Sequence, residues 1–425
     1  MEHKVLSGIT VVEFGQFVAV PATGQLLADA GARVIKVEAL EGDPTRAAGQ
    51  IVPGVGRQHL NKNRGKYSVS LDLHRPEGVA IARQLAARAD VVLSNFRPGL
   101  ATSLGLDYDH IRQLNPKVIY AVNTAYGEKG DDAGLPGFDI VVQAYSGLYT
   151  SDNTVEDAAP DISLPYCDYM AACLLALSVM MALFHRERTG EGQQVSTSLL
   201  AAALYLQNQR MIQIDVVDTW REGFVKQIPS LRAEGKTWAE INSLAAAEQP
   251  YRLHRAYLNA YPTADGSVLI SCSSRALMRK LLAVLEVDDP WVTDPNWEPP
   301  DVPQAYIEQV RQKIAAKLRQ QSTAYWVRAL HAAGVPAGEV RHWTEVPDHP
   351  QIRANDLLWS YEHELVGKTT VVSTPFKMSK TPPTLAFPPR LLGADTAAIL
   401  TELGYSAEEI ASLAAASVIR VRETE

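Results

Sequence analysis

The sequence ITVVEFGQFVAVPATGQLLADAGARVIKVE at residues 9–38 contains the patterns of a strand, a helix and a second strand in succession. Residues 9–14 are rich in β-branched side chains and predict a buried strand, and residues 33–38 predict another. Between them, residues 22–30 carry the small and apolar side chains typical of a packed helix. The turn-forming run EGDP then closes the second strand. This stretch therefore predicts one strand–helix–strand unit.

The same alternation continues over the first 125 residues. Residues 68–73 alternate in polarity with a period of two, and residues 91–96 and 118–124 are further apolar runs of strand length. Pro76 opens a helical pattern that extends to Arg88, which suits proline at a first helical position. Strands that alternate with helices at this spacing predict an α/β fold with a doubly wound, mostly parallel sheet.

The composition of the whole chain limits the number of domains and the kinds of partner that can be expected. It has 425 residues, of which 46% are hydrophobic and 21% charged, so we expect two or three domains with a sizeable core. The net charge is −8, and no long run of Lys or Arg occurs. Because phosphate backbones are bound by clustered basic side chains, a nucleic-acid partner is not expected.

The cysteines and the apolar runs indicate a cytoplasmic protein. Cys167, Cys173 and Cys272 form no CxxC pair and no even disulfide framework, so neither a secreted scaffold nor a metal site is expected. The first residues, MEHKVLSGITVVEF, lack the pattern of a signal peptide. The longest apolar run, residues 170–184, has the length of one core helix rather than a membrane span.

Asp168 stands at the head of that apolar run, in a helical pattern over residues 168–188. An Asp directly before a helix is typically an N-cap that accepts backbone N–H bonds. The same position also suits a reactive carboxylate, because a helix N-terminus stabilises anions and a closed pocket makes a carboxylate a better nucleophile. The residues alone leave both interpretations open.

A second group of candidate residues follows the predicted strand at residues 91–96. Asn95, Phe96 and Arg97 stand where a doubly wound sheet presents its ligand crevice, and the Arg97 guanidinium could meet a phosphate. Phe96 could equally be a core side chain and Arg97 a solvated loop charge. No GxxxxGK[ST], HExxH, GxSxG or GxGxxG motif occurs, which disfavours a nicotinamide dehydrogenase and the other common enzyme classes.

Several longer blocks occur together in a characteristic order. They read VVLSNFRPGLATSLGLDY, PGFDIVVQAYSG, FHRERTGEGQQVSTSLL and LLGADTAAILTELGYSAEEI. With these blocks the sequence resembles the class III CoA-transferase family, the relatives of formyl-CoA transferase, which is related to the α-methylacyl-CoA racemases. The resemblance covers essentially the whole chain except roughly residues 215–255.

This resemblance implies a domain organisation. Family members have a Rossmann-like doubly wound large domain made from both chain ends, a smaller inserted α+β domain, and two chains threaded through each other as an interlocked dimer. We therefore expect a large domain at residues 1–215 with the CoA site and the nucleophile, a small domain at 216–330, and a return to the large domain at 331–425. A homodimer is expected, although a related heteromer is also compatible.

The resemblance also implies the site residues. The family nucleophile is an Asp that opens a long apolar helix before the HRERTGxGQ segment, and here that residue is Asp168. Asp139 in PGFD matches an acidic residue of the site, although a turn or helix cap would also explain it. The positions that match coenzyme A contacts are Ala19, Leu71, Asp72, Leu73, His74, Asn95, Phe96, Arg97 and Phe138. Coenzyme A is then a substrate, and no separate cofactor is expected.

The sequence departs from the family pattern near the adenine end of the expected CoA site. Ala39 stands where formyl-CoA transferase has an arginine, so Lys36, Arg46 or Lys66 are alternative partners for the CoA phosphates. The run Ser271–Arg275 replaces a run of glycines in the small domain, which argues against formate and oxalate as substrates. We expect a mid-sized organic acid whose identity the sequence does not name.

Three functions are compatible with the resemblance. The first is transfer of CoA from an acyl-CoA to a carboxylic acid through an anhydride and a thioester of Asp168. The second is an acyl-CoA racemase or isomerase, which Phe138 disfavours because the racemases have a His there and a phenyl ring cannot transfer a proton. The third is a non-catalytic CoA-binding subunit, which the presence of Asp168 disfavours.

Overall fold

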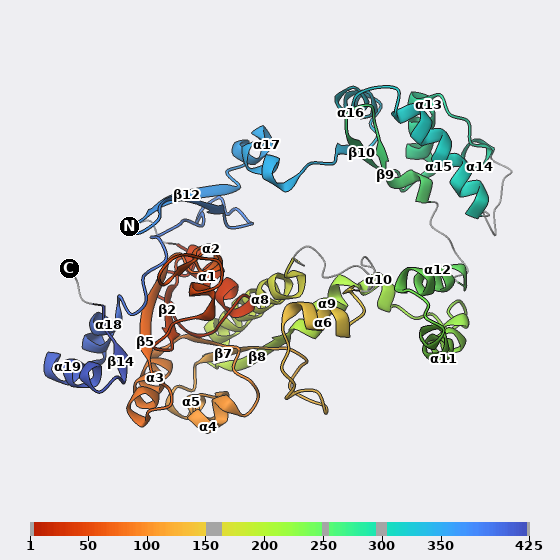
Figure 1. The fold of residues 1–425 in the computed structure, drawn as a ribbon. Coiled ribbons are helices and arrows are strands. Elements are labelled where there is room, and N and C mark those ends of the chain that lie inside the picture. Colours follow the sequence, from red (N-terminus) through yellow and green to blue (C-terminus); the bar gives the residue numbers. More distant parts are fainter. Residues whose placement is uncertain (1–3, 150–163, 249–254, 295–303, 423–425) are drawn as a thin grey trace. The chain divides into compact units, whose positions relative to one another are not determined.

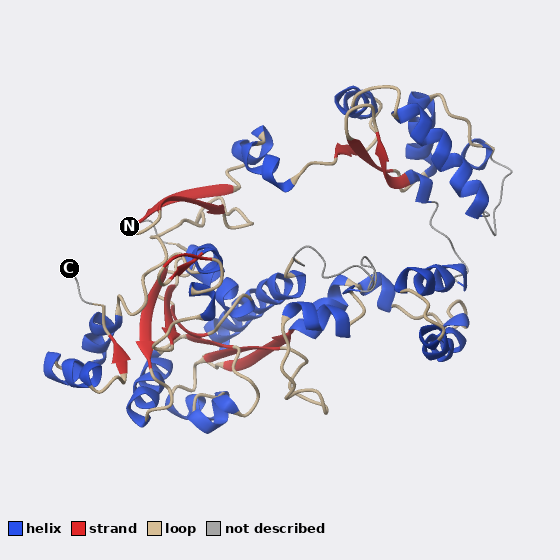
Figure 2. Ribbon diagram, viewed as in Figure 1, coloured by secondary structure: helices blue, strands red, loops and turns tan. Residues whose placement is uncertain are grey.

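In a computed structural model, the chain is described for residues 4–149, 164–248, 255–294 and 304–422. The chain divides into two compact units (Figures 1 and 2). The large unit contains residues up to 212 and from 354 onward, and the small unit contains residues 213–353. The small unit is therefore an insertion between two segments of the large one.

A seven-stranded sheet forms the centre of the large unit. Its strands follow the order β14-β5-β2-β1-β6-β7-β8. Neighbouring strands run parallel except β14, which pairs antiparallel with β5 at one edge. Strand order reverses between β1 and β6, which defines the switch point of a doubly wound sheet. The strands are β1 (Thr10–Phe14), β2 (Arg33–Glu38), β5 (Lys66–Leu71), β6 (Val91–Ser94), β7 (Ile119–Thr124), β8 (Gln193–Ser198) and β14 (Ile419–Arg420).

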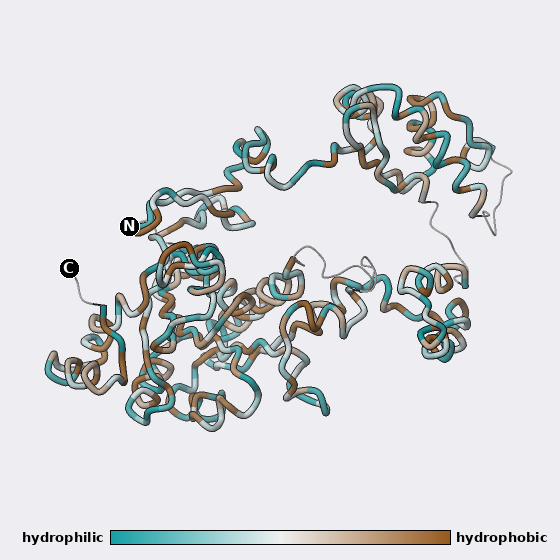
Figure 3. Tube along the Cα trace, in the orientation of Figure 1, coloured by the Kyte–Doolittle hydropathy of each residue, from teal (hydrophilic) through white to brown (hydrophobic). Residues whose placement is uncertain are grey.

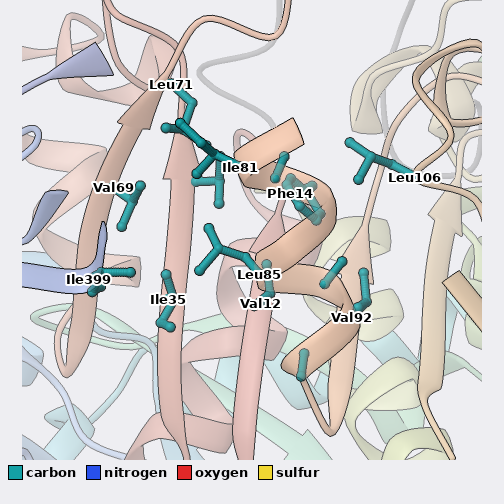
Figure 4. Close-up of a cluster of buried hydrophobic side chains, with 14 of the residues drawn as sticks. Val12, Phe14, Ile35, Val69, Leu71, Ile81, Leu85, Val92, Leu106 and Ile399 are labelled. Atoms are coloured by element: carbon teal, nitrogen blue, oxygen red, sulfur yellow. The ribbon is translucent and has the colours of Figure 1, made fainter. Parts of the chain in front are cut away.

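Alternate side chains of these strands pack on opposite faces of the sheet. On one face, Val12, Ile35 and Val92 share a buried cluster with Ile81 and Leu85 (Figure 4). That cluster includes side chains of α3 (Pro76–Arg88), α5 (Tyr108–Leu114), α18 (Thr396–Leu403) and α19 (Ala407–Ala415). On the other face, the alternate residues of β1, β2 and β6 pack on α1 (Ala19–Asp29) and α8 (Tyr166–Thr189). Both faces are covered, as a parallel sheet requires.

The helix α8 is the most apolar long helix in the described chain, as its hydropathy in Figure 3 illustrates. Among the described residues it alone is long and apolar enough to cross a membrane by length and composition. Core helices of soluble proteins pass the same test, and α8 packs along α1 and against β7 and β8. Only 39% of its most apolar stretch is buried, however, so part of its apolar surface has no cover in the described chain.

The large unit contains further short elements around the sheet. The β12–β13 hairpin is attached by Tyr361, whose hydroxyl donates to the Leu60 carbonyl oxygen at 3.1 Å. The other elements are η1 (Pro44–Arg46), β3 (Gln50–Val52), β4 (Val55–Gly56), α2 (Arg57–Lys62), α4 (Leu100–Leu104), α6 (Asp139–Tyr145), α9 (Leu199–Leu206), α10 (Asn208–Met211), β12 (Leu358–His363) and β13 (Gly367–Val372), with α17 (Pro350–Ala354) at the boundary.

The small unit has its own three-stranded antiparallel sheet and its own buried core. The predicted return to the large domain at residue 331 was too early. The strand β11 (Ala337–Glu339) pairs with β10 (Ser267–Ser271) inside the small unit, so the boundary falls after residue 353. The remaining elements are α11 (Trp220–Ala233), α12 (Trp238–Glu248), η2 (Arg255–Tyr257), β9 (Leu258–Pro262), α13 (Arg275–Leu285), α14 (Pro290–Thr293), α15 (Gln304–Leu318), α16 (Thr323–Ala332) and η3 (Trp343–Asp348).

Candidate active site

A cavity of about 600 Å³ lies at the carboxyl ends of β1, β2, β5, β6 and β7. The loops that follow these strands line it, together with the starts of α6, α8 and α9. This is the switch point of the sheet, where doubly wound folds bind their ligands because successive loops diverge there. All of the lining residues belong to the large unit.

The cavity brings together ten of the eleven residues that the sequence singled out. Those on its wall are Leu71, Asp72, Leu73, His74, Asn95, Phe96, Arg97, Phe138, Asp139 and Asp168. Ala19 is buried at the start of α1 and is not on the wall, but its backbone N–H favours the charged form of the Asp168 carboxylate and lowers the pKa of that group. Residues far apart in the chain therefore meet at one edge of the sheet.

Asp168 is not the N-cap of its helix. The helix α8 begins at Tyr166, two residues earlier, and the cap residue Pro165 has no side chain that can accept a hydrogen bond. Asp139 performs the capping role instead, because its Oδ2 accepts the backbone N–H of Asp168 at 2.8 Å. The Asp168 carboxylate is thus in the first turn of α8 and lines the cavity rather than closing its own helix.

The surroundings of Asp168 disfavour its charged form. Burial, followed by the negative charge of Asp139, raises the pKa of Asp168 to about 7. The ammonium of Lys62 and the amide of Ala19 act in the opposite direction. A half-buried carboxylate that is poorly solvated yet still ionised near neutrality is suited to nucleophilic attack.

Lys62 is a cation of this site that the sequence reasoning missed. It is the last residue of α2, is 4% exposed, and has no hydrogen bond within the described chain. Its neighbour Asn61 donates to the Tyr169 hydroxyl at 3.1 Å, which links the end of α2 to the first turn of α8. Burial lowers the pKa of Lys62, and the carboxylates of Asp43 and Asp168 oppose that effect. No motif or spacing in the sequence connects Lys62 with Asp168.

A buried ionic network lies beneath the loop after β1. The Lys36 ammonium contacts Glu13 at 3.0 Å and Asp43 at 2.9 Å, and Lys66 contacts the other Glu13 oxygen at 2.8 Å. Burial alone would lower the pKa of Lys36, yet the Glu13 and Asp43 carboxylates raise it above its ordinary value. For Lys66 burial dominates and lowers the pKa to about 8.

The prediction that Lys36, Arg46 or Lys66 could hold the CoA phosphates was wrong. All three are at most 3% exposed, and each is paired with a buried carboxylate. Arg46 is bound to Glu38 at 2.7 Å through Nε. Lys36 on β2 and Lys66 on β5 point into the fold, and Arg46 of η1 is buried beside them, where their carboxylate partners neutralise all three.

The same network positions the loop that lines the cavity. Lys36 Nζ donates to the Gly15 carbonyl oxygen at 2.6 Å, and the backbone N–H of Phe17 points to Asp43 Oδ1 at 3.5 Å. Phe17 has a φ of 65°, a left-handed conformation that costs a non-glycine residue free energy. Its ring meets that of Phe138 edge to face, with centroids 5.0 Å apart. The sequence reasoning missed Phe17, whose backbone conformation depends on these tertiary contacts.

The residues predicted at the nucleotide end are partly structural. Asn95 bridges two loops, since it accepts from the Gln16 N–H at 3.1 Å and donates to the Gln16 carbonyl oxygen at 2.9 Å. Phe96 packs on Phe14 at the edge of the core, with ring centroids 5.8 Å apart. Arg97 is the one exposed Lys or Arg side chain on the described cavity wall, and His74 adds an exposed imidazole. Both alternatives for Phe96 therefore have support, because it packs on the core and also lines the cavity.

These features define an α/β protein with an acidic pair beside a ligand crevice. Residues 6–396 match the family described as CoA-transferase family III. The chain therefore belongs to CoA-transferase family III. Its activity is transfer of CoA between acyl-CoA and acid substrates in acyl-CoA metabolism.

Relatives and solved structures agree with this assignment. The chain is 33% identical to succinate–glutarate CoA-transferase of Agrobacterium fabrum, over 94% of this chain and 95% of the relative. It is also 33% identical to a probable fatty acyl-CoA transferase of Mycobacterium tuberculosis, over 93% and 98% of the two chains. A crystal structure of that mycobacterial protein has a TM-score of 0.75 at 30% identity, covering 93% of this chain and 99% of the other. A CaiB/BaiF family protein from Brucella suis has a TM-score of 0.70 at 26% identity, over 95% and 100% of the chains.

Proposed function

We propose that this protein transfers coenzyme A through covalent intermediates on Asp168. In the first half-reaction a carboxylate oxygen of Asp168 attacks the thioester carbonyl carbon of the donor. The new C–O bond forms, the C–S bond breaks, and CoA leaves as its thiolate. The thiolate then attacks the aspartyl carbonyl carbon of the anhydride, which releases the donor acid and leaves an aspartyl-CoA thioester. No external proton is needed in either step.

The second half-reaction reverses the first with a different acid. The acceptor carboxylate attacks the aspartyl thioester carbon, which gives a new anhydride and CoA thiolate. Attack of the thiolate on the acceptor's carbonyl carbon forms the product thioester and restores the Asp168 carboxylate. The regenerated carboxylate contains one oxygen that came from the acceptor acid, and this exchange is a signature of the proposed route.

The observation that carries the proposal is the position of Asp168 on the cavity wall in the first turn of α8. Partial burial removes water that would weaken the nucleophile, and the helix N-terminus stabilises negative charge that develops beside it. Asp139 holds the backbone N–H of Asp168, so the nucleophile has no capping bond to break before it reacts. We assign Asp139 a positioning role.

For coenzyme A we propose an extended placement along the carboxyl ends of the strands. Arg97 after β6 would meet the phosphates with its guanidinium, and His74 after β5 would add a ring N–H donor, because both side chains are exposed on the described wall. Phe96 and Phe138, together with the loop after β5, would contact the rest of the coenzyme A molecule. Coenzyme A serves as a substrate in this scheme, and no separate cofactor takes part.

We also propose that two copies of the chain form an interlocked homodimer, acting in the cytoplasm. Three large apolar side chains on one face of α8 support this assembly. Leu177, Met181 and Phe184 are 51%, 63% and 64% exposed in the described chain. Residues spaced by four and three positions share a helix face, and a contiguous apolar face of this kind is usually covered by a partner.

Labelling with heavy oxygen tests the proposed mechanism. The wild-type enzyme is incubated with a donor acyl-CoA and a panel of carboxylic acids carrying heavy oxygen, and the peptide containing Asp168 is analysed by mass spectrometry. We expect label in Asp168 and new CoA thioesters in solution. Hydroxylamine added during turnover should modify the same residue.

Two variants serve as matched controls for this experiment. Asp168→Asn should abolish both transfer and labelling, whereas Asp109→Asn, at an exposed carboxylate on α5, should leave both unchanged. Full transfer by the Asp168→Asn enzyme would overturn the mechanism. Exchange of the substrate α-proton with deuterated buffer in place of transfer would instead indicate a racemase.

A further inference from the structure

The side chain of Asn123 is a polar group of the cavity wall that the proposed mechanism does not use. It lines the cavity, is 5% exposed, and makes no hydrogen bond within the described chain, although its Oδ1 is buried. Most buried carboxamide oxygens in folded proteins have a partner, because an unpaired one costs free energy. The partner of Asn123 must therefore come from what the cavity binds.

The neighbouring polar side chain on this wall already has a partner. Thr124 ends β7 and lines the cavity, and its hydroxyl oxygen accepts the backbone N–H of Gly127 at 3.0 Å. That hydrogen bond stabilises the turn after the strand. The backbone of Asn123 pairs with Thr197 of β8, but its side chain supports no turn or cap in the described chain. A structural role thus explains Thr124 and does not explain Asn123.

Asn123 lies on the face of the sheet that packs on α8. Ile119 and Ala121 of β7 pack in one cluster with Leu175 of α8, and alternate residues of a strand share a face, so Asn123 points to the same side. Asp168 is in the first turn of α8 and lines the same cavity at the carboxyl ends of the strands. Asn123 and Asp168 therefore border the cavity from the same face of the sheet.

The residues that follow Asn123 pass beside the first turn of α8. Ala125 and Tyr126 pack in one cluster with Cys167, which directly precedes Asp168. The reacting carbonyl carbon of the substrate must reach Asp168 in the proposed mechanism. Asn123 is consequently placed beside the acyl group.

The groups proposed for the CoA phosphates lie away from Asn123. Phe96, which directly precedes Arg97, packs in the cluster on the opposite face of the sheet. His74 follows β5, which is four strands away from β7 in the sheet order. The nucleotide end of coenzyme A therefore does not supply the partner of Asn123.

We propose that Asn123 is a specificity-determining residue that hydrogen-bonds a hydroxyl group on the acyl chain. A carboxamide oxygen requires a donor, which a hydroxyl supplies, whereas a keto or carboxylate substituent only accepts and an alkyl chain does neither. The terminal torsion of Asn is broad, so its oxygen can turn towards a bound ligand. An alkyl chain would displace water from this wall without replacing the hydrogen bonds of that water, which costs affinity. This assignment rests on the proposed function, because it concerns the acid that Asp168 would serve.

Matched acceptors test the assignment with the full-length enzyme. Butyrate is compared with 2-, 3- and 4-hydroxybutyrate, each carrying heavy oxygen in its carboxyl group and offered with the same acyl-CoA donor. We expect kcat/KM to be about tenfold or more higher for at least one hydroxy acid than for butyrate. Transfer to butyrate that equals or exceeds transfer to all three hydroxy acids, with label in Asp168, would overturn the assignment and leave the mechanism standing. Absence of transfer to all four acids would also overturn the assignment, and absence of label in Asp168 with every acid tried would overturn the mechanism as well.

Substitution of Asn123 shows whether this residue produces the preference. Asn123→Leu keeps a similar shape without hydrogen-bonding atoms, so the ratio of hydroxybutyrate to butyrate transfer should fall to about one. Gln113→Leu, at an exposed carboxamide on α5, is the matched control and should keep the wild-type ratio. A preference for the hydroxy acid that persists in Asn123→Leu would assign it to another residue and contradict the proposal.

Thermal unfolding without substrate separates this role from a structural one. Asn123→Leu removes a buried oxygen that has no partner, so its unfolding temperature should equal or exceed that of the wild type. A marked fall in the unfolding temperature of Asn123→Leu would show that the carboxamide supports the fold, and would overturn its assignment to the substrate.

Discussion

At the scale of single residues, the site divides two tasks between two carboxylates. Asp139 accepts a hydrogen bond from the backbone N–H of Asp168 in the first turn of α8. This leaves the carboxylate oxygens of Asp168 available to the cavity. The negative charge of Asp139 also adds to burial in raising the pKa of Asp168. Asp139 thus both binds the backbone N–H of Asp168 and raises the pKa of its carboxyl group.

The pH dependence of transfer should report the ionisation of Asp168. Because only the carboxylate attacks in the proposed mechanism, we expect kcat/KM to rise with pH through about 7, the value to which burial and Asp139 raise the pKa of Asp168. Lys62→Met removes a cation that lowers this pKa, so the midpoint should move to higher pH by roughly half a unit or more. Lys62→Arg should retain the wild-type midpoint. The measurement is a pH profile of kcat/KM, and an unmoved midpoint in Lys62→Met would exclude the electrostatic role of Lys62.

The raised pKa of Asp168 also predicts a pH-dependent cost in stability. The unfolded carboxyl titrates near 3.8 and the folded one near 7, so the folded state holds the proton more tightly and the free energy of unfolding falls as pH rises between these values. Asp168→Asn removes this effect. Its stability gain over wild type should be larger at pH 8 than at pH 5 by roughly 2 kcal/mol.

Urea unfolding at the two pH values measures this difference. The control is Asp109→Asn, whose exposed carboxylate should give the same small change at pH 5 and pH 8. An identical gain for Asp168→Asn at both pH values would contradict the raised pKa.

At the scale of secondary-structure elements, the parallel strands position the site through a buried ionic network. Lys36 of β2 lies between Glu13 of β1 and Asp43 of the next loop, and it also holds the Gly15 carbonyl oxygen. The loop after β1 then presents Phe17 to the cavity and the Ala19 amide to Asp168. The charges of two neighbouring strands thereby fix the loop that borders Asp168.

Removal of this central cation should destabilise the large unit and impair the site. Lys36→Met leaves Glu13 and Asp43 buried with insufficient positive charge, and the loss of one partner of a buried ion pair typically costs ~3–5 kcal/mol. We expect a lower unfolding temperature and a reduced kcat. Lys117→Met, at an exposed lysine between α5 and β7, is the control and should behave as wild type. A thermal unfolding curve of Lys36→Met that superimposes on that of the wild type would show that the network has no such role.

At the scale of the whole molecule, α8 has both a buried and an exposed apolar surface. One side packs on α1, β7 and β8, while Leu177, Met181 and Phe184 are exposed in the described chain. A helix that is apolar on nearly every side needs cover on each side. The proposed dimer would provide that cover.

Sedimentation velocity tests this assembly. We expect the wild-type protein to sediment with the mass of two chains, and Met181→Glu to reduce the dimer fraction because a charge would enter an apolar contact. Lys129→Glu, at an exposed loop position, should not change the distribution. A wild-type protein that sediments as a monomer at micromolar concentration would exclude the homodimer.

Local patterns predicted the individual elements well where their signals were strong. The strand at residues 33–38 and the helix at 76–88 have the predicted bounds, because β-branched alternation and a proline at the first helical position are local signals. The strand predicted at 68–73 instead spans Lys66–Leu71. Asp72 leaves the strand because its carboxylate accepts the His74 N–H at 2.9 Å and forms a turn.

The sequence by itself determined the α/β class and the family resemblance, and it singled out Asp168 as the candidate nucleophile, since periodicity and motif order are properties of neighbouring residues. Only the tertiary structure showed that Asp139 binds the N–H of Asp168 in the first turn of α8, and that the charge of Lys62 acts on Asp168. Only the structure, likewise, showed that Lys36 and Lys66 are buried with Glu13. These contacts join segments that are distant in the chain. Burial and charge pairing depend on which distant residues meet, and for that reason no local pattern could reveal them.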